Sequence, residues 1–75
     1  MKYKELIEKI GKIVEDCKLL LRVQGDIICI DGLHFHVDTI NRIQMVLQRY
    51  GECEWWILPS DTLANGVMYK IRIFN

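Results

Sequence analysis

The sequence predicts a small α+β domain in the chain order α-β-β-α-β-β, with a four-stranded antiparallel sheet and two helices packed on one face. Three observations lead to this fold class. Two segments carry apolar residues at helical spacing, four short segments read as strands, and turn-forming residues separate most of them. The chain has 75 residues, which predicts a single domain over residues 1–75.

The first helix is predicted over residues 3 to about 21. Its apolar residues recur at steps of three and four, which gives one broad buried face. They are Leu6, Ile7, Ile10, Ile13, Val14, Cys17, Leu20 and Leu21. Charged residues occupy the opposite face, among them Glu5 and Lys9, a pair four residues apart in the favourable order. Gly25 then interrupts the pattern.

A β-hairpin is predicted over residues 26–37. Two strand-like runs, 26–30 and 33–37, flank Asp31-Gly32, a dipeptide that tolerates the positive φ angles of a type I′ turn. A two-residue turn fixes the register, and facing residues share one side of the sheet. That register places four residues on the side away from the helices: Ile27, Cys29, His34 and His36.

The second helix is predicted to begin at Asp38 or Thr39, either of which can cap its N-terminus. It runs to about Tyr50, and Gly51 is the expected stop.

Two alternating strands are predicted at the end of the chain, over residues 52–58 and 67–74. The connection between them is long for a hairpin. Asn65-Gly66 could itself be a tight turn, in which case the third strand continues past a bulge near Pro59. Both arrangements fit the sequence.

Two helices on one face leave the other face of the sheet uncovered. Alternation sends the adjacent Trp55 and Trp56 to opposite sides, so we expect Trp55 in the core and Trp56 on the uncovered face. Soluble monomers seldom expose a large apolar patch. The uncovered face is predicted to carry Ile27, Cys29, His34, His36, Glu54, Trp56, Leu58, Met68, Lys70, Arg72 and Phe74.

The histidines raise the question of a metal site. Cys29, His34 and His36 would supply three zinc ligands if they met on one face of the hairpin. Simple alternation of polar residues along a strand explains the same pattern, and the spacing matches no recognised ligand set. We therefore expect no metal and no cofactor, with these three residues as the candidate ligands and Asp31, Asp38 or Glu54 as a possible fourth.

Enzyme activity is not expected. Cys29 opposite His34 has the residue types of an activated thiol. A catalytic cysteine also needs an oxyanion hole and a substrate cleft, which a flat sheet face does not readily provide.

Charge separates two classes of partner. A sheet that presents Trp56 with Lys70 and Arg72 has the ingredients for base stacking and phosphate contact, so single-stranded nucleic acid is the alternative ligand. Ten basic residues balance ten acidic ones, however, and a net charge of zero disfavours nucleic acid because phosphate neutralisation supplies most non-specific affinity.

A soluble, cytoplasmic protein is expected. The three cysteines are scattered without a CxxC motif, and the sequence shows no secretory signal. Its longest apolar runs, residues 27–30 and 55–58, are far shorter than the ~20 residues that span a bilayer, so no membrane association is expected.

Taken together, these features predict a non-enzymatic protein-binding module. It is expected to act as a homodimer, or as an inhibitor or adaptor of a larger protein, through the uncovered sheet face. Trp56 is the expected anchor. The expected apolar surround is Ile27, Leu58, Met68 and Phe74, and the expected polar specificity groups are His34, His36, Lys70 and Arg72. Interfacial histidines would weaken association below about pH 6.5.

Overall fold

The chain folds as two α-β-β units placed side by side. The computed structural model describes residues 4–50 and 53–74. Its elements are α1 (Lys4–Asp16), β1 (Leu20–Gln24), β2 (Ile27–Gly32), α2 (Val37–Leu47), β3 (Cys53–Pro59) and β4 (Val67–Ile73).

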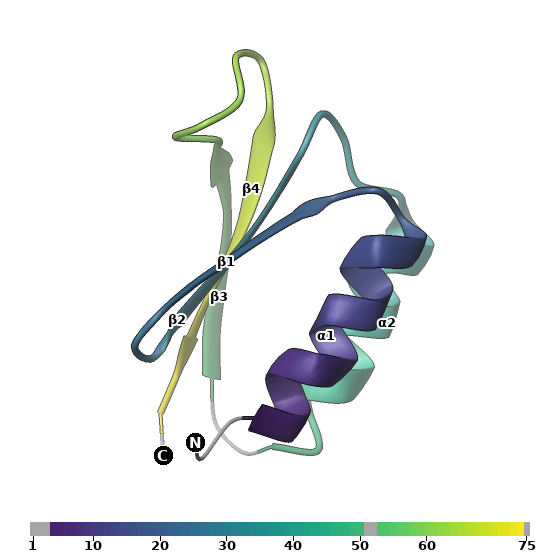
Figure 1. Cartoon of the computed structure of the whole chain (residues 1–75), viewed down its shortest axis with the longest axis vertical. Coiled ribbons are helices and arrows are strands. Elements are labelled where there is room, and N and C mark those ends of the chain that lie inside the picture. Colours follow the sequence, from purple (N-terminus) through teal and green to yellow (C-terminus); the bar gives the residue numbers. More distant parts are fainter. Residues whose placement is uncertain (1–3, 51–52, 75) are drawn as a thin grey trace.

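The four strands form one antiparallel sheet in the spatial order β1-β2-β4-β3. Both helices lie on the same side of this sheet (Figure 1). The fold class and the order of elements predicted from the sequence are confirmed. In each unit the first strand is an edge of the sheet and the second is central, so β1 and β3 are the two edges.

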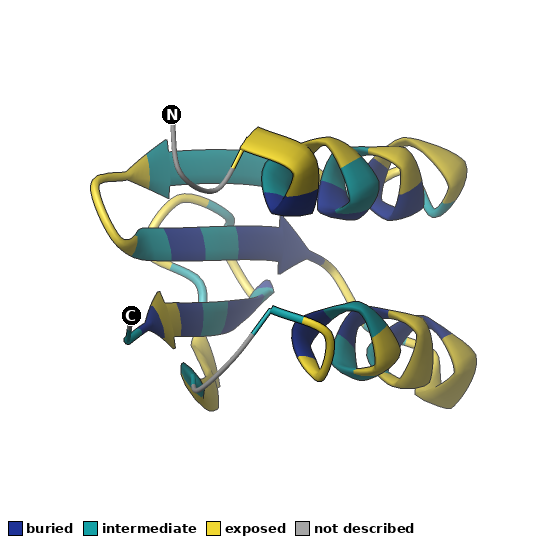
Figure 2. Cartoon of the chain, turned by 90° about the horizontal axis from the view of Figure 1, so that it is seen from below, coloured by how far each residue is buried: buried dark blue, intermediate teal, exposed yellow. Residues whose placement is uncertain are grey.

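The core fills the space between the helices and the two central strands. Buried residues line the facing sides of α1, α2, β2 and β4 (Figure 2). The cluster consists of Leu6, Ile10, Ile13, Val14, Ile28, Ile30, Ile43, Leu47, Tyr69, Ile71 and Ile73. Tyr69 is fully buried, and its hydroxyl accepts a hydrogen bond from Gln44 Nε2 at 3.4 Å.

Helix α1 ends earlier than its apolar pattern predicts. The N–H of Leu19 donates to the carbonyl of Val14 at 2.9 Å, and the N–H of Lys18 donates to the carbonyl of Glu15 at 3.3 Å. With Lys18 at a φ of 56°, this is the Schellman C-terminal motif. Glycine usually occupies the left-handed position, so a lysine there gives no stop signal, and the predicted continuation to residue 21 is wrong.

The first hairpin is therefore displaced along the sequence. Its turn is Gly25-Asp26, with Gly25 at a φ of 60°, and Gln24 pairs with Ile27. The predicted strand over residues 33–37 is wrong, because residues 33–36 connect β2 to α2.

Helix α2 begins at Val37, so the predicted cap at Asp38 or Thr39 is late by two or three residues. His36 occupies the N-cap position without a side-chain capping bond. The helix ends at Leu47, and turns continue to residue 50. The predicted stop at Gly51 lies outside the described residues.

The second hairpin is close to its prediction. β3 starts at Cys53, and β4 has its predicted start and ends at Ile73. The third strand ends at Pro59 rather than continuing past a bulge, and residues 60–66 form a loop.

Candidate functional site

Exposed apolar side chains gather on β3. Of the large apolar side chains exposed among the described residues, four are consecutive on this strand; we call them the β3 surface. They are Trp55, exposed by 45%, Trp56 by 37%, Ile57 by 51% and Leu58 by 38%. The remainder are Leu20 on β1, Val37 and Met45 on α2, and Leu33 in the connection between β2 and α2. Trp55 is thus not a core residue as predicted, because its strand is an edge of the sheet.

Among residues 4–50 and 53–74, no strand pairs with the backbone of β3 along its outer edge. Ser60 N–H donates to the Gly66 carbonyl at 3.0 Å, which fixes the alternation of the antiparallel ladder between β3 and β4. Residues at even positions from Glu54 to Leu58 therefore direct their N–H and C=O groups to β4. Residues at odd positions direct theirs away from the sheet. Pro59 holds one of these outward positions, where its lack of an N–H costs the sheet nothing.

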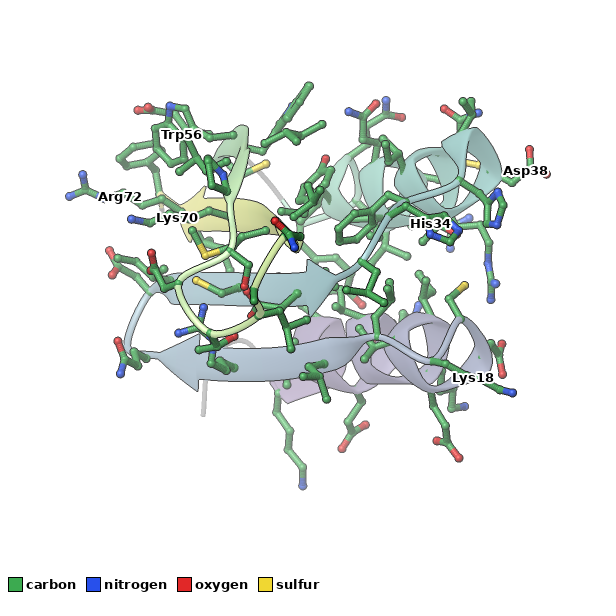
Figure 3. The ribbon with its side chains drawn as sticks, turned by 90° about the horizontal axis from the view of Figure 1, so that it is seen from above. Lys18, His34, Asp38, Trp56, Lys70 and Arg72 are labelled. Atoms are coloured by element: carbon green, nitrogen blue, oxygen red, sulfur yellow. The ribbon has the colours of Figure 1, made fainter. Side chains whose placement is uncertain are left out.

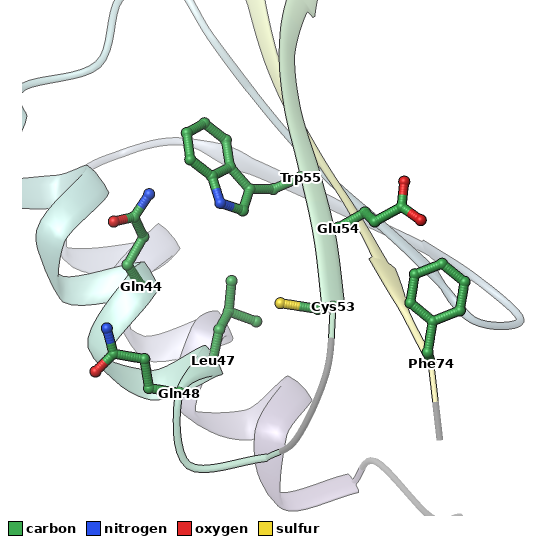
Figure 4. A pocket seen from close by; sticks show the side chains of 7 residues that line it. All are labelled: Gln44, Leu47, Gln48, Cys53, Glu54, Trp55 and Phe74. Atoms are coloured by element: carbon green, nitrogen blue, oxygen red, sulfur yellow. The ribbon is translucent and has the colours of Figure 1, made fainter.

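A cleft of about 520 Å³ opens on the helix side of this edge, between α2 and β3 (Figure 4). On the helix side it is lined by Gln44, Leu47, Gln48, Cys53 and Trp55, and Glu54 and Phe74 complete its rim from the opposite side of β3 (Figure 4). The Trp55 ring stacks on Tyr69 at a centroid distance of 5.5 Å and an interplanar angle of 17°.

Two titratable groups in or beneath this cleft are shifted toward their neutral forms. Burial raises the pKa of the Cys53 thiol above its ordinary value. Burial also raises the pKa of the Tyr69 hydroxyl, although the hydrogen bond from Gln44 acts in the opposite direction. The lining also includes the acidic Glu54 and the polar Gln44 and Gln48, so the cleft is of mixed polarity.

A smaller hollow of about 360 Å³ lies on the opposite, outer face of the sheet. It is lined by Ile27, Trp56, Leu58, Lys70 and Arg72, all of which the sequence predicted as interface residues. Figure 3 shows Trp56, Lys70 and Arg72 near one another at this end of the outer face.

The cations of this outer hollow differ in their surroundings. The Arg72 guanidinium lies 5.3 Å from the centroid of the half-buried Phe74 ring, and its Nε is 3.8 Å from Asp26 Oδ2. Lys70 stands opposite Trp56 in the strand register. The hollow thus combines an exposed indole with two positive charges.

The other end of the outer face is covered by the loop of residues 60–66. Asp31 is fully buried there and accepts hydrogen bonds from Arg22 Nε at 2.9 Å and from Ser60 Oγ at 2.8 Å. The hydrogen bond to Asp31 raises the pKa of Arg22. Met68 beside them is only 3% exposed, so its predicted place on an open surface is wrong. Nothing in the sequence pattern signals that a loop folds back over the sheet.

The histidines are not part of the sheet. His34 and His36 are exposed in the connection between β2 and α2, with their rings edge-on at a centroid distance of 5.0 Å. Cys29 belongs to β2, and its neighbours Ile28 and Ile30 point into the core, so Cys29 points to the outer face. The three metal candidates are thus separated, and no group of three or more potential metal ligands occurs in residues 4–50 and 53–74. The expected pH dependence of association loses its structural basis.

A groove that the sequence did not predict runs between the two helices. It measures about 350 Å³ and includes the cations Lys9, Lys12, Arg42 and Arg49. Two of them form ion pairs, Lys9 with Glu5 at 3.7 Å and Arg42 with Asp16 at 3.1 Å. These pairs reduce the positive potential of the groove.

No protein-family model, curated protein or solved structure matches this chain. Within the described part of the chain, neither helix has the length and apolar character needed to cross a membrane.

Proposed function

We propose that this chain is a protein-binding module whose partner adds an extended strand to the outer edge of β3. The observation that carries the proposal is the coincidence of outward backbone amides with the exposed side chains of the β3 surface. In strand addition the backbone hydrogen bonds supply affinity, and alternate side chains supply specificity.

The composition of β3 supports this proposal. Natural sheets protect an edge by shortening it or by placing charges and prolines along it. β3 is seven residues long, and its protective residues, Glu54 and Pro59, lie near its two ends. The centre of the strand keeps apolar side chains on both faces, which is unfavourable in water and favourable at an interface.

The two hollows beside β3 support the same mode of binding. The cleft lies next to Trp55 on the helix side, and the outer hollow lies next to Trp56 and Leu58. Successive side chains of an added strand point to opposite faces, so they would contact the two hollows in turn. A role as inhibitor or adaptor of a larger protein fits this arrangement. The cysteines Cys17, Cys29 and Cys53 are free thiols, in keeping with the proposed cytoplasmic location.

A matched pair of variants tests the proposal. Ile57 on β3 and Leu20 on β1 are exposed by 51% and 53%, so a lysine should be tolerated at either position in the monomer. Wild-type, Ile57→Lys and Leu20→Lys proteins are used as bait in a native extract, and any captured protein is purified and rebound. Binding by wild type and Leu20→Lys, with at least tenfold weaker binding by Ile57→Lys, supports strand addition. Equal binding by all three proteins overturns it.

Single-stranded nucleic acid is a second candidate, favoured by the position of Trp56 beside Lys70 and Arg72 in the outer hollow. The zero net charge opposes it. Titration with oligonucleotides at low salt, followed by tryptophan fluorescence, tests this alternative. Saturable binding that Lys70→Ala and Arg72→Ala weaken supports it, and an unchanged signal excludes it.

A further inference from the structure

We infer that the strand added to β3 is β3 of a second copy of this chain, paired antiparallel about a two-fold axis at Trp56. The inference rests on the proposed function and names its partner. The result is one continuous sheet made from two four-stranded sheets, with all four helices on the same side.

The outward backbone groups of β3 are complementary to themselves in this register. A two-fold axis at Trp56 places Trp55 of one copy opposite Ile57 of the other. Both residues direct their amides outward, so each such pair exchanges two hydrogen bonds. Cys53 then faces Pro59, whose missing donor falls at the end of the ladder. The two strands overlap along their whole length, Cys53–Pro59.

The side chains also find apolar neighbours. On the outer face the two Trp56 residues meet across the axis as a non-hydrogen-bonded pair, the type in which side chains approach most closely. On the helix side Ile57 of the second copy packs beside Trp55, at the open mouth of the cleft. Leu58 alone meets a charged residue, Glu54, which stands opposite Arg72 in the register of its own sheet.

Area and charge fit a reversible dimer. The β3 surface is 37–51% exposed, and large apolar side chains have ~150–250 Å² each, so two copies contribute about 700 Å² of exposed apolar surface. Stable interfaces bury roughly 1,200–2,000 Å², so we expect association that depends strongly on concentration. The zero net charge does not oppose it.

The pairing closes at two copies. Once the two β3 strands are joined, both remaining edges of the joined sheet are β1 strands. β1 is five residues long and carries Arg22, so it offers a shorter and less apolar edge. A two-fold contact that uses up its own surface gives a closed dimer rather than a fibre.

Sedimentation equilibrium from about 1 µM to 500 µM tests the inference, because weak dimers dissociate within this range. The weight-average mass of wild type should rise toward twice the monomer mass. Leu20→Lys should follow wild type, and Ile57→Lys should stay at the monomer mass throughout. A wild type that remains monomeric, an equal loss in both variants, or growth beyond the dimer would overturn the inference.

Disulfide trapping tests the register. Cα atoms in a non-hydrogen-bonded pair are ~4.5 Å apart, within the range that a disulfide bridges. Trp56→Cys should therefore form a covalent dimer on mild oxidation, faster than Leu20→Cys and faster than wild type with its native cysteines. Circular dichroism establishes that both variants are folded. Cross-linking of Trp56→Cys no faster than these controls contradicts the two-fold axis at this residue.

The two proposals fail in different ways. If wild type stays monomeric while another protein binds with the same dependence on Ile57, the second copy is the wrong partner and strand addition stands. If neither self-association nor any captured protein depends on Ile57, both proposals fall.

Discussion

The two edge strands occupy equivalent positions in their α-β-β units and differ in almost every surface property. β1 has five residues and β3 has seven. Helix α1 packs against β1, where Gly11 lies close to the Leu21 side chain. β3 instead borders an open cleft beside α2. The same topology therefore yields one covered edge and one exposed edge.

The outward backbone groups of β1 and β3 differ in the same way as their surroundings. Ile73 N–H donates to the Asp26 carbonyl, so even residues of β2 face β4 and odd residues face β1. In the β1–β2 register this leaves Leu21 and Val23 with outward amides, a shorter ladder than that of β3. Both side chains are half-buried, whereas those of β3 are exposed. The position of an edge in the topology therefore does not decide how exposed it is, and in our proposal the longer, more exposed edge is the one that binds.

The largest expected effect is the loss of folding stability when Asp31, the buried carboxylate that binds Arg22 of β1, is replaced. Asp31→Ala removes a fully buried acceptor of Arg22 and Ser60. Arg22 is 38% exposed and can turn to water, so we expect a loss of about 2–3 kcal/mol, less than the ~3–5 kcal/mol of a fully buried pair. Urea unfolding measures the loss.

A matched carboxylate serves as the control for this prediction. Asp26 also approaches an arginine, Arg72, but at 3.8 Å with both side chains about half exposed. Asp26→Ala should cost less than about 1 kcal/mol. Equal losses for Asp26→Ala and Asp31→Ala would show that the buried contact does not stabilise the β1 side.

Amide hydrogen exchange compares the two edges directly. In dilute protein, exchange should be fast at Trp55 and Ile57 and slow at Trp56, which bonds to β4. At concentrations where about nine-tenths of the chains are dimeric, exchange at Trp55 and Ile57 should slow about tenfold. Leu21 and Val23 on β1 should not change. Protection that appears on β1 instead would reverse the assignment of the binding edge.

The smallest expected effect is a loss of folding stability at alkaline pH, caused by Cys53 of β3 and Tyr69 of β4. The folded state raises the pKa of Cys53 and of Tyr69, so it holds these protons more tightly than the unfolded chain does. The associated stability is present below the ordinary thiol and phenol values, ~8.5 and ~10, and is lost as pH rises past them. Urea midpoints at pH 7 and pH 10.5 should show the decrease, and Cys53→Ala and Tyr69→Phe should each reduce it. A midpoint independent of pH would contradict the prediction.

The sequence contained most of the fold but not its local boundaries. Alternation correctly assigned β4, with Tyr69 inward and Lys70 outward, because a central strand buries one face along its length. The end of α1 was not predictable, because the left-handed residue is Lys18 rather than glycine. Because the helix was expected to continue to residue 21, the first hairpin was expected too late in the chain, and His34 and His36 were therefore expected on the sheet.

The candidate site was predictable only in part, because alternation along a strand reports the face of a residue but not the order of the strands. Local alternation decides which face a residue occupies, so it brought Trp56, Lys70 and Arg72 together correctly. The order of strands depends on long-range pairing, which alternation does not report. Trp55 was therefore expected in the core, although its strand lies at an edge. Met68 was expected in the open, because alternation does not report that the neighbouring 60–66 loop folds back over the sheet.

The hydrogen bond between Ser60 and Asp31 holds the 60–66 loop on the sheet and should therefore protect Met68 from oxidation. Met68 lies beneath the 60–66 loop at 3% exposure, whereas Met45 on α2 is 63% exposed. Peroxide should convert Met45 to its sulfoxide at once and reach Met68 only when the loop lifts from the sheet. The oxidation rate of Met68, followed by mass spectrometry without any label, therefore reports how often this loop opens.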